Sequence, residues 1–263
     1  MRSSREHYET LLADHYTWLY GGLENKLAEN TEFFRAQGIR PRGNGRAADL
    51  GAGSGFQSLP LALAGFAVDA VDLSPTLLAE LADHARQRGV ALLPADSDAA
   101  PAPPKIAPGV RPLEADLVEF LKRAADSYEL LVCMGDTLPH LESFAAATAF
   151  LESARQKLEA GGRLVLSFRD LSQPLAGLDR FIPVQNDAER IFTCFLEYER
   201  EHVVVHDLIY LKVDGAVPGW RLHKSHYRKL RIGTAWVTEQ LLRFGFRIAH
   251  ESSVRGFTTI IAQ

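Results

Sequence analysis

The sequence predicts an α/β fold in which a parallel sheet carries helices on both faces. From Arg46 onward, short apolar segments typical of strands alternate with longer segments of helical periodicity. A glycine-rich turn joins the first of these strands, residues 46–50, to the helix that follows it. With 263 residues and 46% hydrophobic positions, the chain is long enough to bury one sizeable core, so we expect a single domain over residues 1–263.

Residues 1–45 precede the alternation and predict a helical lid. Their apolar side chains recur at helical spacing in one or two segments. The loop 40–45 then contains proline and glycine, which interrupt a helix. The aromatic residues Tyr16, Trp18 and Tyr20 lie in this region, either as a lid over a ligand or as ordinary packing of helix on sheet.

The core of the sheet is predicted over residues 46–175. Ser74 and Pro75 predict a helix start, since serine caps a helix and proline suits its first turn. Six prolines in residues 94–112 predict a loop insertion, and Gly161-Gly162 predict the end of a helix over 144–158. The other elements expected here are strands at 66–73, 128–134 and 163–168 and helices from about residue 55 and over 116–126.

Residues 176–232 change character and predict a small antiparallel cap. Segments such as 191–199 and 202–213 are extended and alternating, which is typical of paired strands. We expect this cap to cover one side of the carboxyl edge of the sheet. Residues 233–263 predict the last helix, about 234–244, and two final strands of the sheet.

The overall charge and the cysteines limit the kinds of partner. A net charge of −4 and a pI near 6.1 disfavour a nucleic-acid partner, which calls for a basic face. No apolar run approaches the roughly eighteen residues of a membrane helix, and the N-terminus does not resemble a signal peptide. Cys133 and Cys194 lie in apolar contexts and are interpreted as reduced thiols. We therefore expect a cytoplasmic protein, and homo-oligomerisation stays open.

The glycine-rich turn itself predicts a nucleotide-type pocket. Gly51, Gly53 and Gly55 have the spacing Gly-x-Gly-x-Gly, and such a turn brings backbone N–H groups close to a ligand. A dinucleotide fingerprint would require glycine at Phe56. Asp49 precedes the turn where dehydrogenases usually have an apolar residue. Asp72 ends the second strand, 21 residues after Gly51, where a carboxylate can accept both ribose hydroxyls.

These residues resemble the class I S-adenosylmethionine-dependent methyltransferases. The first motif of that family, acid-x-Gly-x-Gly-x-Gly, corresponds to residues 49–55, and its later acids correspond to Asp72 and Asp116. The resemblance implies a Rossmann-like seven-stranded methyltransferase sheet with an antiparallel last strand, and S-adenosylmethionine as cofactor. It implies these cofactor-binding residues: Asp49, Gly51, Ala52, Gly53, Gly55, Asp72, Leu73, Asp116, Leu117, Met134 and Gly135.

The stretch after the fourth strand, residues 133–141, concerns the methyl acceptor. It lacks the (Asn/Asp)-Pro-Pro-(Tyr/Phe) motif of nucleic-acid amino methyltransferases and is similar to the Gly-Asn-Ser-x-x-His-Leu pattern of the glycine and sarcosine N-methyltransferase group. That resemblance suggests His140 beside substrate or cofactor, Arg169 as a carboxylate clamp and Tyr227 as a pocket residue. Phe168, Asp170 and Leu171 depart from the group's pattern, so the substrate is not carried over.

Purely structural interpretations of the same residues remain open. Arg169 could pair with a surface acid, and His140 could cap a helix. Asp136 could hold a backbone turn or could face a cationic ligand. His202 and His206 would lie about 13 Å apart on a strand, too far to share an ion, so no metal site is expected.

The sequence thus predicts a small-molecule methyltransferase that N-methylates an amino acid or a related amine with a carboxylate. The alternatives are an NAD-dependent oxidoreductase, a non-catalytic S-adenosylmethionine-binding protein, and a protein or RNA methyltransferase with the same core.

Overall fold

A seven-stranded sheet forms the centre of the protein. The computed structural model describes residues 7–94, 107–125, 127–213, 219–254 and 256–263. Within them the strand order is β10-β11-β5-β4-β1-β2-β3, with β11 antiparallel to both of its neighbours. The strands span Arg46–Leu50 (β1), Ala67–Asp72 (β2), Gly109–Glu114 (β3), Tyr128–Cys133 (β4), Leu158–Arg169 (β5), Ile248–Val254 (β10) and Phe257–Ala262 (β11).

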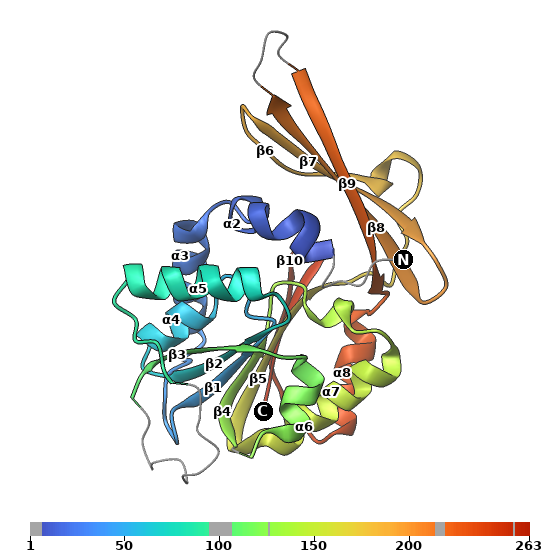
Figure 1. Ribbon diagram of the computed structural model, residues 1–263. Helices are drawn as coiled ribbons and strands as arrows, with labels where there is room; N and C mark the ends of the chain where they lie inside the picture. Colours follow the sequence, from blue (N-terminus) through green and yellow to red (C-terminus); the bar gives the residue numbers. More distant parts are fainter. Residues whose placement is uncertain (1–6, 95–106, 126, 214–218, 255) are drawn as a thin grey trace.

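Helices cover both faces of this sheet (Figure 1). One face packs against α3 (Leu23–Ala36), α4 (Ser58–Leu63) and α5 (Pro75–Gln87). The other packs against α6 (Leu117–Arg123), α7 (Phe144–Lys157) and α8 (Thr234–Arg243). β1 is buried along its whole length because both faces are covered. The predicted fold class, with a seven-stranded sheet and an antiparallel cap, is confirmed.

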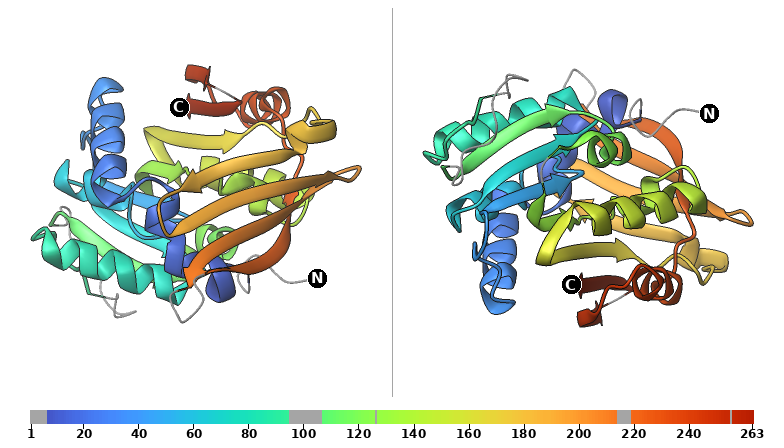
Figure 2. Two further views of the ribbon diagram at one scale, coloured as in Figure 1. Left: turned by 90° about the horizontal axis from the view of Figure 1, so that it is seen from above. Right: turned by 90° about the horizontal axis from the view of Figure 1, so that it is seen from below.

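The cap is a separate four-stranded antiparallel sheet with the order β6-β7-β8-β9. Its strands are Phe181–Asn186 (β6), Arg190–Tyr198 (β7), His202–Val213 (β8) and Gly219–Leu230 (β9). The cap stands over the end of the main sheet in Figure 1, and Figure 2 shows its strands from above and below. The chain leaves the core for the cap and returns from it at neighbouring positions, because the backbone N–H of Leu171 donates to the carbonyl of Ile232 at 3.0 Å.

The N-terminal segment, residues 7–22, lies between the cap and the main sheet. It consists of a π-helical turn (Tyr8–Leu12), a 3₁₀ turn (Ala13–His15) and α2 (Tyr16–Leu19). Leu12 packs with Phe192 and Ile209 of the cap. On the other side Glu9 accepts hydrogen bonds from Ser74 and from Thr76 at the start of α5. The segment therefore contacts both sheets.

Two expected elements differ from those observed. Residues 109–112 were expected in a loop but begin β3, an edge strand parallel to β2, where Pro112 can be tolerated because an edge strand leaves some N–H groups unused. Residues 95–106 of that loop lie outside the described part. Helix α7 ends at Lys157, and Gly161-Gly162 lie within β5, next to an irregularity in its pairing with β4. The glycines therefore accommodate a strand irregularity and do not end a helix.

Both cysteines are free thiols, and Cys133 is buried. None of the helices in the described ranges is long and apolar enough to cross a membrane.

Candidate functional site

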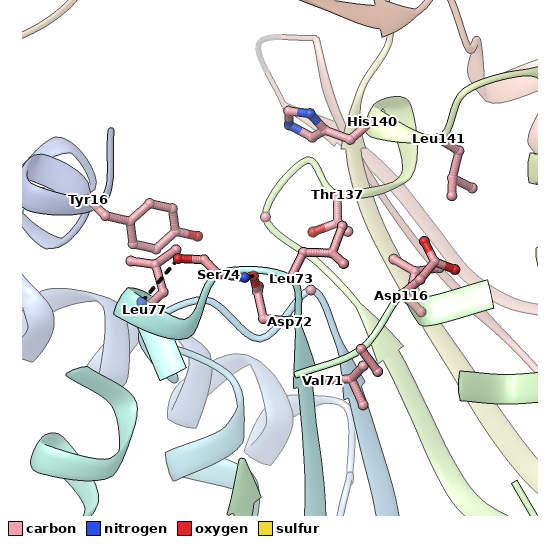
Figure 3. A pocket seen from close by; sticks show the side chains of 14 residues that line it. Tyr16, Val71, Asp72, Leu73, Ser74, Leu77, Asp116, Thr137, His140 and Leu141 are labelled. Carbon is pink, nitrogen blue, oxygen red and sulfur yellow. Dashed lines mark hydrogen bonds between the residues drawn. The ribbon is translucent and has the colours of Figure 1, made fainter. Parts of the chain in front are cut away.

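A cavity of about 130 Å³ opens at the carboxyl ends of β1, β2, β3 and β4, where open α/β sheets bind ligands. We call it the cofactor cavity. Its walls come from the segments that follow each of these four strands and from α2 (Figure 3). The lining residues are Tyr16, Gly51, Val71, Asp72, Leu73, Ser74, Leu77, Ala115, Asp116, Leu117, Gly135, Thr137, His140 and Leu141.

Gly51 forms the floor of the cofactor cavity at the end of β1. Its φ of +88° lies in the left-handed region that favours glycine. A Cβ at this position would lie 2.5 Å from the hydroxyl oxygen of Thr137 and closer still to its methyl group. Thr137 is itself fixed, because its hydroxyl donates to the carbonyl of Met134 at 2.9 Å. Glycine therefore allows the two loops to approach each other.

Asp72 lies at the end of β2 and presents its carboxylate to the cofactor cavity (Figure 3). Oδ2 accepts from the N–H of Gly53 at 2.8 Å, and Oδ1 accepts from the N–H of Ser74 at 2.9 Å. Burial raises the pKa of Asp72, and these N–H groups partly offset the rise. A carboxylate offers about four acceptor positions, so capacity remains for the two hydroxyls of a ribose.

Asp116 lies two residues after the end of β3 and caps the N-terminus of α6. Its Oδ1 accepts from the N–H groups of Val118 and Glu119 at 2.9 and 3.0 Å. Leu117 and Ala115 form an apolar wall beside it. This combination of an apolar wall and a carboxylate suits a flat base with an exocyclic amine, and with Asp72 it suits an adenosine.

The remaining residues expected at the cofactor lie behind the cavity wall and do not line it. Asp49 is fully buried beneath the glycine turn, where it accepts from the hydroxyl of Ser58 at 2.6 Å. A Cβ on Gly55 would collide with Leu81 of α5, so this glycine serves helix packing. Gly53 donates its N–H to Asp72. Ala52 and Met134 pack in the apolar cluster on that face of the sheet.

The buried carboxyl of Asp49 predicts an unusual pH dependence of stability. Burial raises the pKa of Asp49 to about 7, with the hydrogen bonds from Ser58 opposing the rise. Between pH 4 and 7 the folded chain therefore holds a proton that the unfolded chain has lost, so the free energy of unfolding falls as the pH rises. In Asp49→Asn this contribution is absent. Relative to the variant, the cofactor-free wild type should lose about 2–3 kcal/mol between pH 5 and 8.

Urea unfolding of both proteins at the two pH values measures this difference. Every other titrating group is common to the two chains, His140 included, so the comparison isolates Asp49. A constant difference between the two proteins would show that Asp49 is ionised throughout this range.

Tyr16 covers the glycine turn from the side of the N-terminal segment. Its hydroxyl would lie 2.8 Å from a Cβ on Gly53, and its ring stacks on Phe56 with centroids 5.5 Å apart and planes at 12°. Tyr20 packs against both rings, and its hydroxyl donates to the carbonyl of Gly135 at 3.4 Å. Tyr16 therefore lines the cofactor cavity and Tyr20 lines a second cavity, whereas Trp18 packs with the apolar side chains between this segment and the cap.

A second, larger cavity of about 500 Å³ lies between the end of the main sheet, the N-terminal segment and the inner face of the cap. We call it the acceptor cavity. Its apolar lining comes mostly from the cap, and its charged side chains are Lys26, Asp136, Arg169, Asp207 and Lys229. Arg169 and Tyr227, both expected at the site, line it together.

His140 and Tyr227 stand between the two cavities. Their rings stack with centroids 5.2 Å apart and planes at 11°, with His140 on the wall of the cofactor cavity and Tyr227 on that of the acceptor cavity. The ring of Tyr227 also contacts that of His7, with centroids 4.3 Å apart and planes at 32°. Burial, followed by the charge of Lys229, lowers the pKa of His140 to about 3. His140 is therefore neutral at pH 7.

Asp136 connects the end of β5 with β9, the two strands that carry positive charge into the acceptor cavity. Oδ1 accepts from the backbone N–H of Arg169 at 2.9 Å, and Oδ2 accepts from Lys229 Nζ at 2.5 Å. Burial opposes its charge, but Lys229 and the Arg169 N–H more than compensate and hold the pKa of Asp136 below its ordinary value. Within the described ranges no acidic side chain pairs with the guanidinium of Arg169, which stays available to a ligand.

Sequence reasoning missed four charged or titratable residues of the acceptor cavity and its wall: Lys26, Lys229, Asp207 and His7. Lys229 lies two residues after Tyr227 on β9, so the period of a strand places both side chains on one face and could have revealed it. Asp207 and His7 are 200 positions apart, and no local pattern joins them. Groups of three or more metal-ligating side chains are absent from the described part of the chain.

The strand order, the antiparallel β11 and the glycine turn with Asp72 beside it define the class of α/β proteins to which the S-adenosylmethionine-dependent methyltransferases belong. Residues 48–166 match the family model described as a methyltransferase domain. The matched part of the chain is therefore a methyltransferase domain. No curated protein sequence matches the chain.

Solved structures share this fold at low sequence identity. A S-adenosylmethionine-dependent methyltransferase from Clostridium acetobutylicum is 14% identical over 98% of this chain and 96% of its own, with a TM-score of 0.69. The CcbJ methyltransferase from Streptomyces caelestis is 17% identical over 90% and 95%, with a TM-score of 0.70. An amino pentose methyltransferase from Micromonospora echinaspora, involved in calicheamicin biosynthesis, is 19% identical over 92% and 91%, with a TM-score of 0.62.

Proposed function

We propose that this protein transfers a methyl group to the amine nitrogen of a small molecule that also bears a carboxylate. The observation that carries the proposal is the acceptor cavity, which adjoins the cofactor cavity at the His140–Tyr227 pair. It contains the guanidinium of Arg169, which has no acidic partner among the described residues, together with two buried carboxylates, Asp136 and Asp207. A ligand with both an anionic and a cationic end matches these charges.

The chemistry asks little of the protein beyond binding and alignment. S-adenosylmethionine supplies a methyl group on a sulfonium, so the C–N bond forms as the C–S bond breaks and the nitrogen gives up one proton. The chain must hold the nitrogen in line with that methyl group and exclude water. Tyr16, Tyr20 and the inner face of the cap enclose the two cavities for this purpose.

Two structural neighbours support an amine as the acceptor. One is an amino pentose methyltransferase, and another is described as a glycopeptide N-methyltransferase, 16% identical with a TM-score of 0.56. The proposed resemblance to the glycine and sarcosine N-methyltransferase group rests on residues 133–141, 164–171 and 225–231 of this sequence.

Methyl transfer from labelled S-adenosylmethionine to a panel of amino acids and amines tests the proposal directly. We expect the label on nitrogen, identified by mass spectrometry of the product. Label on a hydroxyl or thiol alone would contradict it. Calorimetry separates the earlier alternatives, since a dehydrogenase would bind NADH and a non-catalytic binder would bind S-adenosylmethionine without transferring the methyl group.

Arg169→Ala should raise the KM for a carboxylate-bearing acceptor at least about tenfold, because a charge-assisted bidentate contact is lost. The KM for S-adenosylmethionine should not change, because Arg169 does not line the cofactor cavity. The backbone N–H that Asp136 accepts is retained in the variant. Steady-state kinetics with the acceptor identified above measure both constants.

Arg169→Lys is the matched control. It keeps the charge but removes the planar fork, so its KM should fall between those of the wild type and the alanine variant. An unchanged acceptor KM in Arg169→Ala would mean that the carboxylate binds elsewhere.

A further inference from the structure

Asp207 is a fully buried carboxylate in the wall of the acceptor cavity. It lies on β8 between Val205 and Ile209, which share its face of the strand and are also buried. An apolar residue would suit this stripe of the cap. Burying a carboxylate here costs free energy unless hydrogen bonds compensate it.

Two side chains supply that compensation. His7 Nε2 lies 2.8 Å from Asp207 Oδ2, and Cys194 Sγ donates to Oδ1 at 2.9 Å. His7 is itself fully buried and belongs to the N-terminal segment, whereas Cys194 is the cross-strand neighbour on β7. A thiol is a weak donor, and its pKa is raised by burial and by Asp207, so Cys194 stays protonated.

The two carboxylates of the acceptor cavity are therefore not equivalent. Asp136 is neutralised by the ammonium of Lys229 and tied to the backbone of Arg169. Asp207 has no lysine or arginine partner among the described residues, and two of its roughly four acceptor positions are used. It is the carboxylate with capacity for a cationic group from a ligand.

Asp207 also lies within electrostatic reach of the cationic end of the cavity. Burial raises the pKa of Tyr20, and the charges of Asp136, Arg169 and Asp207 also act on that pKa. Burial likewise raises the pKa of Cys194, on which the charges of Asp207, Lys229 and Arg169 act. Three neighbouring rings, His7, Tyr227 and His140, connect Asp207 with the wall that the two cavities share.

We propose that Asp207 binds the amine of the acceptor while Arg169 binds its carboxylate, which makes the acceptor an amino acid or another compound with both charges. His7 is a positioning residue that orients the Asp207 carboxylate. This inference rests on the proposed function and assigns the amine of the acceptor to Asp207.

Binding selectivity tests the assignment without requiring turnover. The probes are a set of α- and β-amino acids, their N-acetyl forms and their methyl esters, titrated by calorimetry in the presence of S-adenosylhomocysteine. The wild type should bind the best amino acid at least about tenfold more tightly than its N-acetyl form, because a charged hydrogen bond is lost. Asp207→Asn should bring this ratio close to one and keep the preference for acid over ester.

Arg169→Ala should show the reverse pattern, losing the preference for acid over ester and keeping that for amine over acetamide. Cys194→Ser is the matched control, since it retains a donor to Asp207 and should keep both preferences. His7→Gln retains an N–H donor and should preserve much of the amine preference, whereas His7→Phe retains only the ring contact with Tyr227 and should reduce it.

Asp207→Asn with full amine selectivity and unchanged affinity for S-adenosylhomocysteine would overturn the assignment. If that variant does not fold, Asp207→Ser, which removes the charge and keeps an oxygen that His7 and Cys194 can reach, replaces it, and full amine selectivity would overturn the assignment equally. Selective amine binding without transfer of a labelled methyl group would contradict the proposed function and leave the role of Asp207 supported. Methyl transfer to nitrogen by a wild type that does not prefer amine over acetamide would contradict only the role of Asp207.

Discussion

Asp72→Ala is expected to weaken S-adenosylmethionine binding on the order of a hundredfold. The change removes the carboxylate that Asp72 presents to the cofactor cavity. It also leaves the N–H groups of Gly53 and Ser74 without their acceptor, so the glycine turn loses its side-chain bond to β2 and keeps the backbone bonds to Val71. A charged hydrogen bond and two unsatisfied donors together account for an effect of this size. Calorimetric titration with S-adenosylmethionine and with S-adenosylhomocysteine measures it.

Asp83→Ala is the matched control, because Asp83 lies exposed on α5 and pairs only with Arg86 one turn away. It should bind the cofactor like the wild type. Asp72→Asn should fall between the two, since its amide oxygen can still accept one of the N–H groups. Wild-type cofactor affinity in Asp72→Ala would exclude Asp72 from the binding site.

Gly51→Ala is the second substitution from which we expect a large effect. The added Cβ would collide with the Thr137 side chain, whose hydroxyl oxygen would be 2.5 Å away. Alanine would also have to adopt a φ of +88°. A left-handed backbone costs about 1–2 kcal/mol for a residue with a Cβ, and the collision forces the two loops apart in addition. We expect loss of detectable cofactor binding and a lower melting temperature, measured by calorimetry and thermal denaturation.

Two further variants divide the effect of Gly51→Ala between its causes. Gly89→Ala requires a φ of +67° but its Cβ would meet nothing within 4 Å, so it reports the backbone cost alone. Adding Thr137→Ala to Gly51→Ala removes the nearest atoms and should restore part of the stability. A Gly51→Ala protein as stable as Gly89→Ala would indicate that the loops separate without cost.

The sequence was most informative where chemistry and local structure coincide. The alternation from Arg46 predicted the sheet, and the spacing of Gly51 and Asp72 predicted two residues that line the cofactor cavity. The sequence was less informative about which residues of the motif line the cavity and which are buried beneath it. Asp49 belongs to the same motif, yet it lies buried beneath the turn, where it accepts from Ser58. It is a residue of β1, and the side chains of a strand point to the two faces of the sheet and not beyond its end, where the cavity lies.

The acceptor cavity was harder to predict because its residues come from three distant parts of the chain. Arg169 and Tyr227 were accessible only through a resemblance, whereas Asp207 and His7 meet through the packing of the N-terminal segment against the cap. No periodicity within either segment encodes that contact. Long-range pairs of this kind depend on tertiary structure, which local propensity does not describe.

The adjacent entry and exit of the cap have an evolutionary consequence. The chain leaves the core at Leu171 and returns at Ile232, and these two residues are hydrogen-bonded to each other. The residues of the cofactor cavity lie outside this excursion, within residues 16–141. Insertions, deletions and substitutions inside the excursion that spare Tyr227 and Lys229 can therefore accumulate without changing the cofactor cavity. Natural selection can diversify the acceptor while the methyl-donor machinery is inherited unchanged.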